Sequence, residues 1–317
     1  MNKESPRTGS ASQAELGRSL TLSSDAMAGA GAMLAGIALL SGMDVVVKLL
    51  VTRDVSVLHI LVIRSWLIVA VMLLWHAARG KLGELMPVRK VQQGIRALLG
   101  IIAPLLFFYG LRYLPLTDSV VVFFTSTLAV TFLSAVILGE QVGVHRWSAV
   151  VIGYIGVVIA MRPSGEGQVI GYALAFGGSL GYAYLFLSGR YLSQTETVPS
   201  LVFFYNFGVA VTSSLWILLV ANELLVSLPF NTLSGIVAIA VLAVCGHYLM
   251  TLAFSKAEVS LIAPIEYTGL VWAVIFDYLI WQVAPQAATL FGALIIIGSG
   301  LYVMHRERKN KVTVEAA

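Results

Sequence analysis

Charged side chains are scarce in this chain of 317 residues. Asp, Glu, Lys and Arg make up 11% of it, whereas hydrophobic residues make up 58%. A soluble globular domain carries roughly a quarter charged residues, so this composition excludes one and indicates an integral membrane protein. The apolar runs are continuous and do not alternate with polar positions, which argues against a β-barrel. The expected fold class is therefore an all-α integral membrane bundle.

Cysteine and phosphate-binding motifs are also lacking. The single cysteine, Cys245, excludes a disulfide framework within the chain. No Cys and His cluster has metal-ligand spacing, and no glycine-rich loop follows a strand to cradle a phosphate. We therefore expect no metal, no nucleotide and no other cofactor.

What the chain does contain is ten apolar stretches, each about long enough to cross a bilayer. Short connections join them, so no soluble domain is inserted. Pro104 and Pro264 lie inside the third and ninth stretches and predict kinks, because proline removes a backbone donor and crowds the preceding turn. The expected spans are Met27 to Leu50, Val57 to Ala78, Ile95 to Arg112, Leu116 to Leu138, Trp147 to Met161, Val169 to Tyr191, Leu201 to Ala221, Leu233 to Phe254, Val259 to Trp281 and Ala287 to Met304.

The basic residues lie mostly on one side of these spans. The side of the N-terminus holds clusters such as Arg79 with Lys81 and Arg306 with Arg308, whereas the opposite side holds only Arg53, Arg112 and Arg162. Because short cytoplasmic loops collect Lys and Arg, both termini are expected in the cytoplasm. The positive charge is thus a topology signal, and the expected partner is the lipid bilayer with no nucleic acid.

The fourth and ninth stretches are similar to each other. Aligning Gly110 with Ala253 without a gap pairs Thr117 with Ser260, Phe124 with Tyr267 and Thr125 with Thr268. The chain therefore contains a repeat of five helices. An odd number of crossings makes the second copy enter the membrane from the opposite side, which is typical of inverted-repeat secondary transporters.

Several short motifs resemble the EamA type of the drug/metabolite transporter superfamily. The first repeat is carried by Gly110–Ser119 (GLRYLPLTDS), Leu138-Gly139-Glu140, Arg146-Trp147 and Met161-Arg162-Pro163. The second is carried by Gly246-His247, Ala253-Phe254, Ala263-Pro264, Tyr267-Thr268 and Val271-Trp272.

The resemblance implies ten transmembrane helices, alternating access and a central cavity in a bacterial inner membrane. Its repeats would cover residues 27–162 and 168–305, between cytoplasmic tails at 1–26 and 306–317. It looks closest to a branch that includes riboflavin and S-adenosylmethionine carriers. The chain departs from the family pattern at Glu266 and Asp277, where uncharged residues are expected, and at Val283, which replaces the acidic residue matching Glu140.

Charged residues inside the first two spans are candidates for substrate binding, because burying a charge in a bilayer costs roughly 2.5 kcal/mol or more. Asp44 and Lys48 are four residues apart and share one helix face, and Arg64 is expected at a similar depth in the next helix. Together they are predicted to line the outward end of the cavity. The alternative is that Lys48 reaches the outer interface while Asp44 and Arg64 pair to hold two helices together.

His247 and Glu266 are candidates for proton coupling near the inner third of their helices. A carboxylate desolvated in a membrane cavity titrates closer to neutrality, which a proton-coupled carrier needs. The alternatives are a protonated Glu266 hydrogen-bonded to a neighbouring helix and a structural His247. Near the interfaces, Asp277 and Glu140 are expected in solvated or salt-bridging roles, and Asp118 as a helix N-cap.

A second group of candidates lies near the midplane, where inverted-repeat carriers place substrate. Aromatic faces and hydroxyls suit a flat or amphipathic organic solute, although aromatic packing between helices is the alternative. The predicted substrate contacts are Phe124, Thr125, Tyr205, Asn206, Tyr267, Thr268 and Trp272.

The sequence as a whole predicts an inner-membrane carrier of a small organic metabolite, monomeric or homodimeric, driven by a proton or substrate gradient. Mixed intramembrane charge favours a zwitterion or an anion with an aromatic part. A passive facilitator or channel is the nearest alternative. An enzyme acting on a membrane lipid would need a paired-carboxylate metal site or a nucleophile with its base, and neither pattern is found in the sequence.

Overall fold

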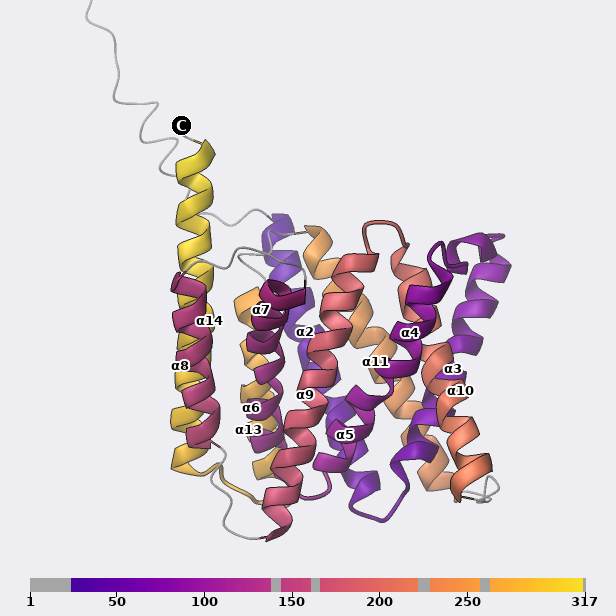
Figure 1. Cartoon of the computed structure of the whole chain (residues 1–317). Coiled ribbons are helices and arrows are strands. Elements are labelled where there is room, and N and C mark those ends of the chain that lie inside the picture. The colour runs from indigo at the N-terminus through magenta and orange to yellow at the C-terminus, as the bar shows by residue number, and fades with distance from the viewer. Residues whose placement is uncertain (1–23, 138–143, 161–165, 222–228, 257–262, 316–317) are drawn as a thin grey trace, which may run out of the picture.

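The computed structural model describes residues 24–137, 144–160, 166–221, 229–256 and 263–315 as helices and short connections, with no strand among them. Figure 1 shows the helices side by side in one bundle. They are α2 (Ser24–Val51), α3 (Val57–Ala78), η1 (Leu82–Leu85), α4 (Lys90–Gly100), α5 (Ile102–Gly110), α6 (Leu116–Phe123), α7 (Thr125–Ile137), α8 (Val144–Ala160), α9 (Glu166–Leu192), α10 (Val198–Trp216), η2 (Ile217–Ala221), α11 (Phe230–Lys256), η3 (Ala263–Tyr267), α13 (Thr268–Trp281) and α14 (Ala287–Glu315).

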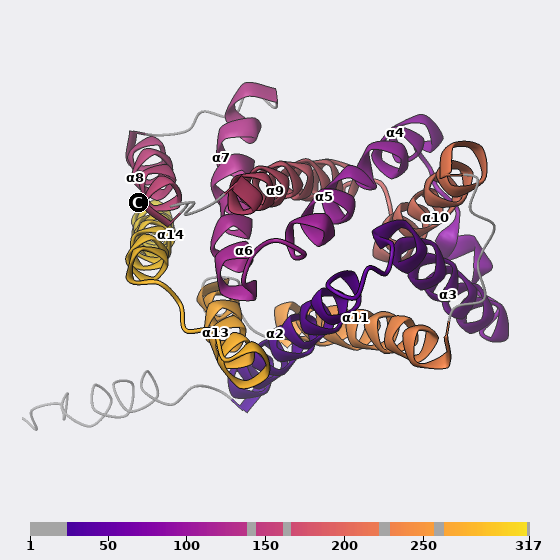
Figure 2. The same ribbon diagram turned by 90° about the horizontal axis from the view of Figure 1, so that it is seen from below.

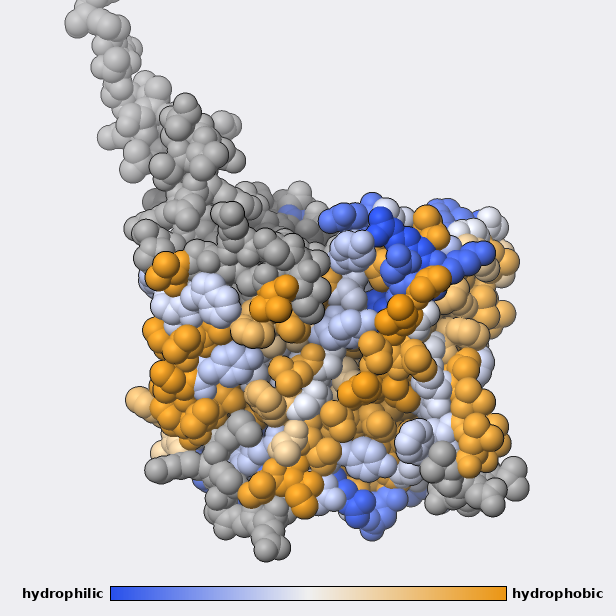
Figure 3. Space-filling view, in the orientation of Figure 1, coloured by the Kyte–Doolittle hydropathy of each residue, from blue (hydrophilic) through white to orange (hydrophobic). Residues whose placement is uncertain are grey.

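The described helices make this a multi-pass membrane protein. Six of them are long and apolar enough to cross a bilayer: Met27–Val51, Val57–Ala78, Lys90–Gly110, Gln168–Gly189, Val198–Leu219 and Phe230–Ala253. Shorter apolar helices cover Leu116–Val130, Trp147–Ala160 and Ala287–Tyr302. In the face shown in Figure 3, hydrophobic surface fills the middle of the bundle and hydrophilic residues gather at its two ends.

The main helix contacts join the first half of the chain to the second. Helix α2 packs along α11, α5 along α9, α3 along α10, and α8 along α14. The view along the bundle in Figure 2 shows α5 with α9 on one side and α2 with α11 on the other, while α8 with α14 and α3 with α10 lie at opposite ends. If the spans of the first half are matched in order with those of the second, α2 corresponds to α9 and α5 corresponds to α11. The contact of α2 with α11 then has a counterpart in the contact of α9 with α5.

Two helices are interrupted where the sequence predicts a kink. The third span breaks between α4 and α5 at Ile101, about one turn before Pro104. The ninth contains the 3₁₀ segment η3, which includes Pro264. Both interruptions agree with the missing backbone donor of proline. The fourth span also breaks, between α6 and α7 at Phe124, and the ninth changes from η3 to α13 after Tyr267, the residue paired with Phe124 by the repeat.

Glycine permits very close helix contacts between the halves. A Cβ atom on Gly36 of α2 would lie 3.0 Å from the carbonyl oxygen of Gly246 in α11. A Cβ atom on Gly178 of α9 would lie 2.7 Å from the backbone nitrogen of Phe107 in α5. Without side chains at these positions the backbones approach closely, which increases van der Waals contact between membrane helices.

The Gly36→Val variant is expected to destabilise the bundle by about 1–3 kcal/mol, because its side chain overpacks a filled contact. Its apparent melting temperature in detergent should fall clearly. Gly31→Val is the matched control on the same helix, since nothing lies within 4 Å of a Cβ atom there. Equal melting temperatures for the two variants would contradict this close contact.

A carboxylate also joins the halves at the end of the bundle that holds the α3–α4 connection. The Glu196 residue, 6% exposed, accepts hydrogen bonds from the backbone N–H groups of Val88 at 3.1 Å and Arg89 at 2.6 Å. Burial raises the pKa of the Glu196 carboxyl, but hydrogen bonds from Arg89, Val88 and the Ser200 hydroxyl outweigh it and leave the pKa below its ordinary value. Glu196 is therefore ionised at neutral pH.

Candidate functional site

Arg64 is a buried charge in the interior of the bundle. It lies on α3, its residue is 8% exposed, and its Nε has no hydrogen-bond partner among the described residues. Its Cζ lies 5.8 Å from the centre of the Phe108 ring, which is a cation–π contact. A buried guanidinium with an unused donor is costly, and an anionic group on a ligand would satisfy it.

Two further titratable side chains lie within electrostatic range of this guanidinium. Asp44 on α2 is half-buried and interacts with Arg64, although no ion pair within 4 Å joins them in the described part of the chain. His247 on α11 is exposed and also interacts with Arg64, while its Nδ1 lies 2.8 Å from the carbonyl oxygen of Ala243. The structure therefore places Asp44 and Arg64 in one region of the bundle and adds His247 to them.

Aromatic side chains surround these charges. Tyr182 on α9 and Tyr205 on α10 are both half-buried and both lie near Arg64. The Tyr182 ring makes edge contacts with Phe107 at 6.1 Å and Phe123 at 5.2 Å between centroids. The charged groups and these rings form what we call the central site, defined by Asp44, Arg64, Phe108, Tyr182, Tyr205 and His247.

Arg96 extends the central site toward the α3–α4 end. It lies on α4, donates from Nη1 to the carbonyl oxygen of Leu201 at 3.0 Å, and its Cζ lies 5.8 Å from the centre of the Tyr205 ring. Its Nε is buried without a partner among the described residues. Tyr205 therefore lies within electrostatic range of both arginines. Arg96 was not among the predicted site residues, because its position near a span end is typical of a cytoplasmic basic residue.

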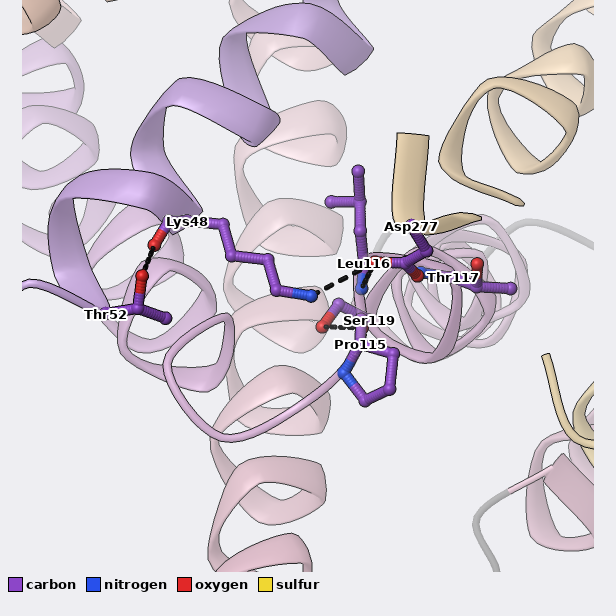
Figure 4. Close-up of polar contacts among 7 residues, drawn as sticks. All are labelled: Lys48, Thr52, Pro115, Leu116, Thr117, Ser119 and Asp277. Atoms are coloured by element: carbon purple, nitrogen blue, oxygen red, sulfur yellow. Dashed lines mark hydrogen bonds and ion pairs between the residues drawn. The ribbon is translucent and has the colours of Figure 1, made fainter. Parts of the chain in front are cut away.

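Lys48 lies apart from the central site. Its Nζ forms an ion pair with Asp277 Oδ1 at 3.1 Å, and both side chains are buried. The Nζ also lies 4.3 Å from the centre of a Trp281 ring. Figure 4 shows Lys48 pointing from α2 toward Asp277 and the start of α6. Asp277 was expected to be either solvated or in a salt bridge, and the structure shows the salt bridge.

Asp118 is not the N-cap of α6, so that prediction is wrong. The N-cap is Pro115, and the first amides of the helix, those of Leu116 and Thr117, donate to Asp277. The Asp118 carboxylate instead accepts a hydrogen bond from the Tyr172 hydroxyl. The carboxylate of a distant helix replaces the local cap because α13 packs against α6.

Phe124 and Tyr267, which the repeat pairs and which are predicted near the midplane, contact each other. Their ring centroids are 5.1 Å apart. Thr125 is fully buried and its Oγ1 has no partner among the described residues, whereas the Thr268 hydroxyl donates to the carbonyl oxygen of Ile265 at 2.6 Å. One pair of residues at matching positions of the two repeats therefore meets at the boundary between the halves.

The other predicted residues are more scattered. Asn206 is buried on α10 with its Oδ1 unpartnered in the described part, and Trp272 packs beside Met33 and Ile37 of α2. Glu266 is half-buried in η3, and no hydrogen bond or ion pair joins it to His247 among the described residues. The structure therefore does not join Glu266 to His247. Glu140 lies outside the described residues.

A large groove lies away from these charges. It has a volume of about 700 Å³ and is lined by apolar side chains of α7, α8 and α9 that include Phe132, Trp147 and Tyr154. None of the charged candidates lines it. We place the candidate site at the central site because unsatisfied charge, and not volume, identifies where a polar ligand is held.

Comparison with known proteins finds a family and several named relatives. The model of the EamA-like transporter family matches residues 27–162 and 169–304. An S-adenosylmethionine uptake transporter of Rickettsia bellii is 29% identical, over 63% of this chain and 68% of that protein. A pseudopaline exporter of Pseudomonas aeruginosa is 25% identical, over 64% and 71%. A riboflavin transporter of Rhizobium johnstonii is 26% identical, over 71% and 72%.

A solved crystal structure has a similar fold. It aligns with a TM-score of 0.60 over 88% of this chain and 98% of the other, at 19% sequence identity. At that identity the similarity concerns the fold alone.

Proposed function

Because the chain belongs to the EamA-like transporter family, we propose that it is a secondary transporter that moves a small organic metabolite across a bacterial inner membrane by alternating access. The observation that carries this proposal is Arg64, a buried guanidinium whose Nε has no hydrogen-bond partner among the described residues, in the same region as the half-buried Asp44. An acidic and a basic side chain held apart inside a membrane protein are typical of a substrate site.

The proposed architecture is ten spans arranged as two inverted five-helix repeats. The equivalent helix pairs, α2 with α11 and α9 with α5, support it. The contact between Phe124 and Tyr267 supports it as well, because residues near a two-fold axis meet their own counterparts. The bias of basic residues supports cytoplasmic termini.

The proposed substrate is a zwitterion or an anion with an aromatic part. Arg64 offers a rigid fork of donors to a carboxylate or phosphate, and Asp44 offers an acceptor to an ammonium group. The rings of Phe108, Tyr182 and Tyr205 offer surfaces for stacking. An α-amino acid attached to a flat ring system carries all three features, and S-adenosylmethionine, named for one relative, is such a molecule.

Thermal stabilisation of the purified protein tests this function. A ligand that binds the folded state raises the melting temperature of the protein. At a concentration 100 times its Kd it adds about 2.7 kcal/mol to the free energy of unfolding. The panel contains amino acids, flavins, nucleosides, S-adenosylmethionine and organic anions. We expect stabilisation by a zwitterion or anion, lost in Arg64→Gln. Stabilisation only by uncharged compounds, or by cations that carry no acidic group, would contradict the proposed substrate class.

We also propose that Glu266 takes up and releases the coupling proton. The Glu266→Gln variant, which cannot titrate, is expected to transport at a rate that no longer follows the pH dependence of the parent protein. Uptake into proteoliposomes at a series of pH values measures this. His247→Gln is the comparison, since no hydrogen bond or ion pair joins His247 to Glu266 in the described part of the chain. An unchanged pH profile in Glu266→Gln would remove this residue from coupling.

A further inference from the structure

The ion pair between Lys48 and Asp277 joins the two halves of the chain at one end of the bundle. Lys48 lies in the last turn of α2, and Asp277 lies near the end of α13. Their atoms are 3.1 Å apart, and the side chains are 8% and 1% exposed. In contrast, the ion pairs Lys81–Glu84 and Arg112–Asp54 are exposed, and each lies within the first half of the chain.

Asp277 also holds the start of α6. Its Oδ1 accepts from the backbone N–H of Leu116 at 2.9 Å, and its Oδ2 from that of Thr117 at 2.6 Å. The first amides of a helix lack partners within it and attract negative charge. The Asp277 carboxylate thus accepts hydrogen bonds from one ammonium group and two backbone amides, and these bonds compensate for its removal from water.

A second carboxylate lies beside these amides on α6. Asp118 accepts from the Tyr172 hydroxyl of α9 and from the Thr289 hydroxyl of α14, each at 2.8 Å. Each bond made by Asp277 or Asp118 here joins a helix of the first half to a helix of the second. We call this network the latch, defined by Lys48, Leu116, Thr117, Asp118, Tyr172, Asp277 and Thr289.

We propose that the latch is the gate that closes the non-cytoplasmic end of the transport path, and that Lys48 and Asp277 are positioning residues that do not bind substrate. This inference rests on the proposed transport function. Alternating access requires the helices around the transport path to separate at each end in turn. At this end the latch bonds join α2 to α13 and α6 to α9, α13 and α14, so opening the path there would break them. A buried ion pair suits a gate, because water compensates the separated charges when it opens.

Cysteine accessibility tests the gate without knowledge of the substrate. The parent for this experiment is the full chain with two substitutions. Cys245→Ser removes the native cysteine, which is exposed, and Ser41→Cys introduces the cysteine whose labelling is measured. Ser41 lies about two turns from Lys48 toward the other end of α2. A membrane-impermeant thiol reagent is applied from outside intact cells. We expect Lys48→Met and Asp277→Asn each to raise the labelling rate by about 10-fold, which corresponds to about 1.4 kcal/mol in favour of the open gate.

Two controls separate gating from general loosening. Asp54→Asn removes an exposed pair with Arg112, and Lys81→Met removes an exposed pair with Glu84. Neither pair joins the halves, so both controls are expected to label at the parental rate. If Asp277→Asn does not fold, Lys48→Met decides, because it leaves the bonds to α6 intact. Labelling at the parental rate in folded Lys48→Met, or an equal rise in the controls, would overturn the gate.

The result is independent of the proposed substrate. A faster labelling rate in Lys48→Met, with no ligand found by thermal stabilisation, would support the gate and count against the substrate class. A ligand that binds and is transported by a protein whose latch variants label at the parental rate would support the function and reject the gate.

Discussion

Replacing Arg64 with glutamine is expected to lower transport of the stabilising ligand by about 10- to 100-fold. Hydrogen bonds to a charged group contribute about 1.5–3 kcal/mol, and about 1.4 kcal/mol corresponds to a factor of ten. The Nε of Arg64 has no partner among the described residues that would compete with a ligand for it. The loss should appear in the apparent affinity, measured by initial uptake rates at a series of ligand concentrations.

The matched control for this prediction is Arg79→Gln. Arg79 follows the last turn of the same helix, is exposed, and its Cζ lies 3.8 Å from the centre of the Trp75 ring. Its variant is expected to transport like the parent. An Arg64→Lys variant that transports normally would show that a positive charge suffices, and would count against recognition by the guanidinium fork.

Asp277→Ala is expected to destabilise the protein by about 3–5 kcal/mol, because it leaves the ammonium of Lys48 buried without a partner. The two α6 amides lose their acceptor as well. The apparent melting temperature in detergent measures the effect. The double variant Lys48→Met with Asp277→Leu should recover part of the loss, because it removes both charges of the buried pair.

Arg112→Ala supplies the control for Asp277→Ala. Arg112 forms an ion pair with Asp54, but both side chains are exposed. Exposed pairs contribute about 0–1 kcal/mol, so this variant should melt near the parent. A double variant no more stable than Asp277→Ala would contradict the view that an unpaired Lys48 causes the loss.

The sequence predicted the bounds of the long described helices well because bilayer thickness fixes the length of an apolar span. The alignment that pairs Phe124 with Tyr267 also selected two rings that contact each other. The start of the third span differs from the prediction. Its helix begins at Lys90, whereas the predicted span begins at Ile95, because the first turn of this helix is polar and was assigned to the preceding connection.

The partners of the charged residues could not be predicted in the same way. Asp44 and Lys48 share a helix face, but the long Lys48 side chain reaches Asp277, which lies 229 positions away in the sequence. Only the packing of α13 against α2 and α6 decides that pairing. Tyr182 was missed because an aromatic residue in an apolar span has the same pattern whether it packs against a helix or lines a site.

The measurement that tests the central claim most directly is accumulation of the stabilising ligand in proteoliposomes that contain the purified protein. With an imposed proton gradient or a trapped exchange substrate, the account predicts that labelled ligand rises above its external concentration. Arg64→Gln should slow this rise by about 10- to 100-fold, whereas Arg79→Gln should retain the parental rate. Entry that stops at equal concentrations on both sides under every imposed gradient would contradict secondary transport and identify a passive facilitator.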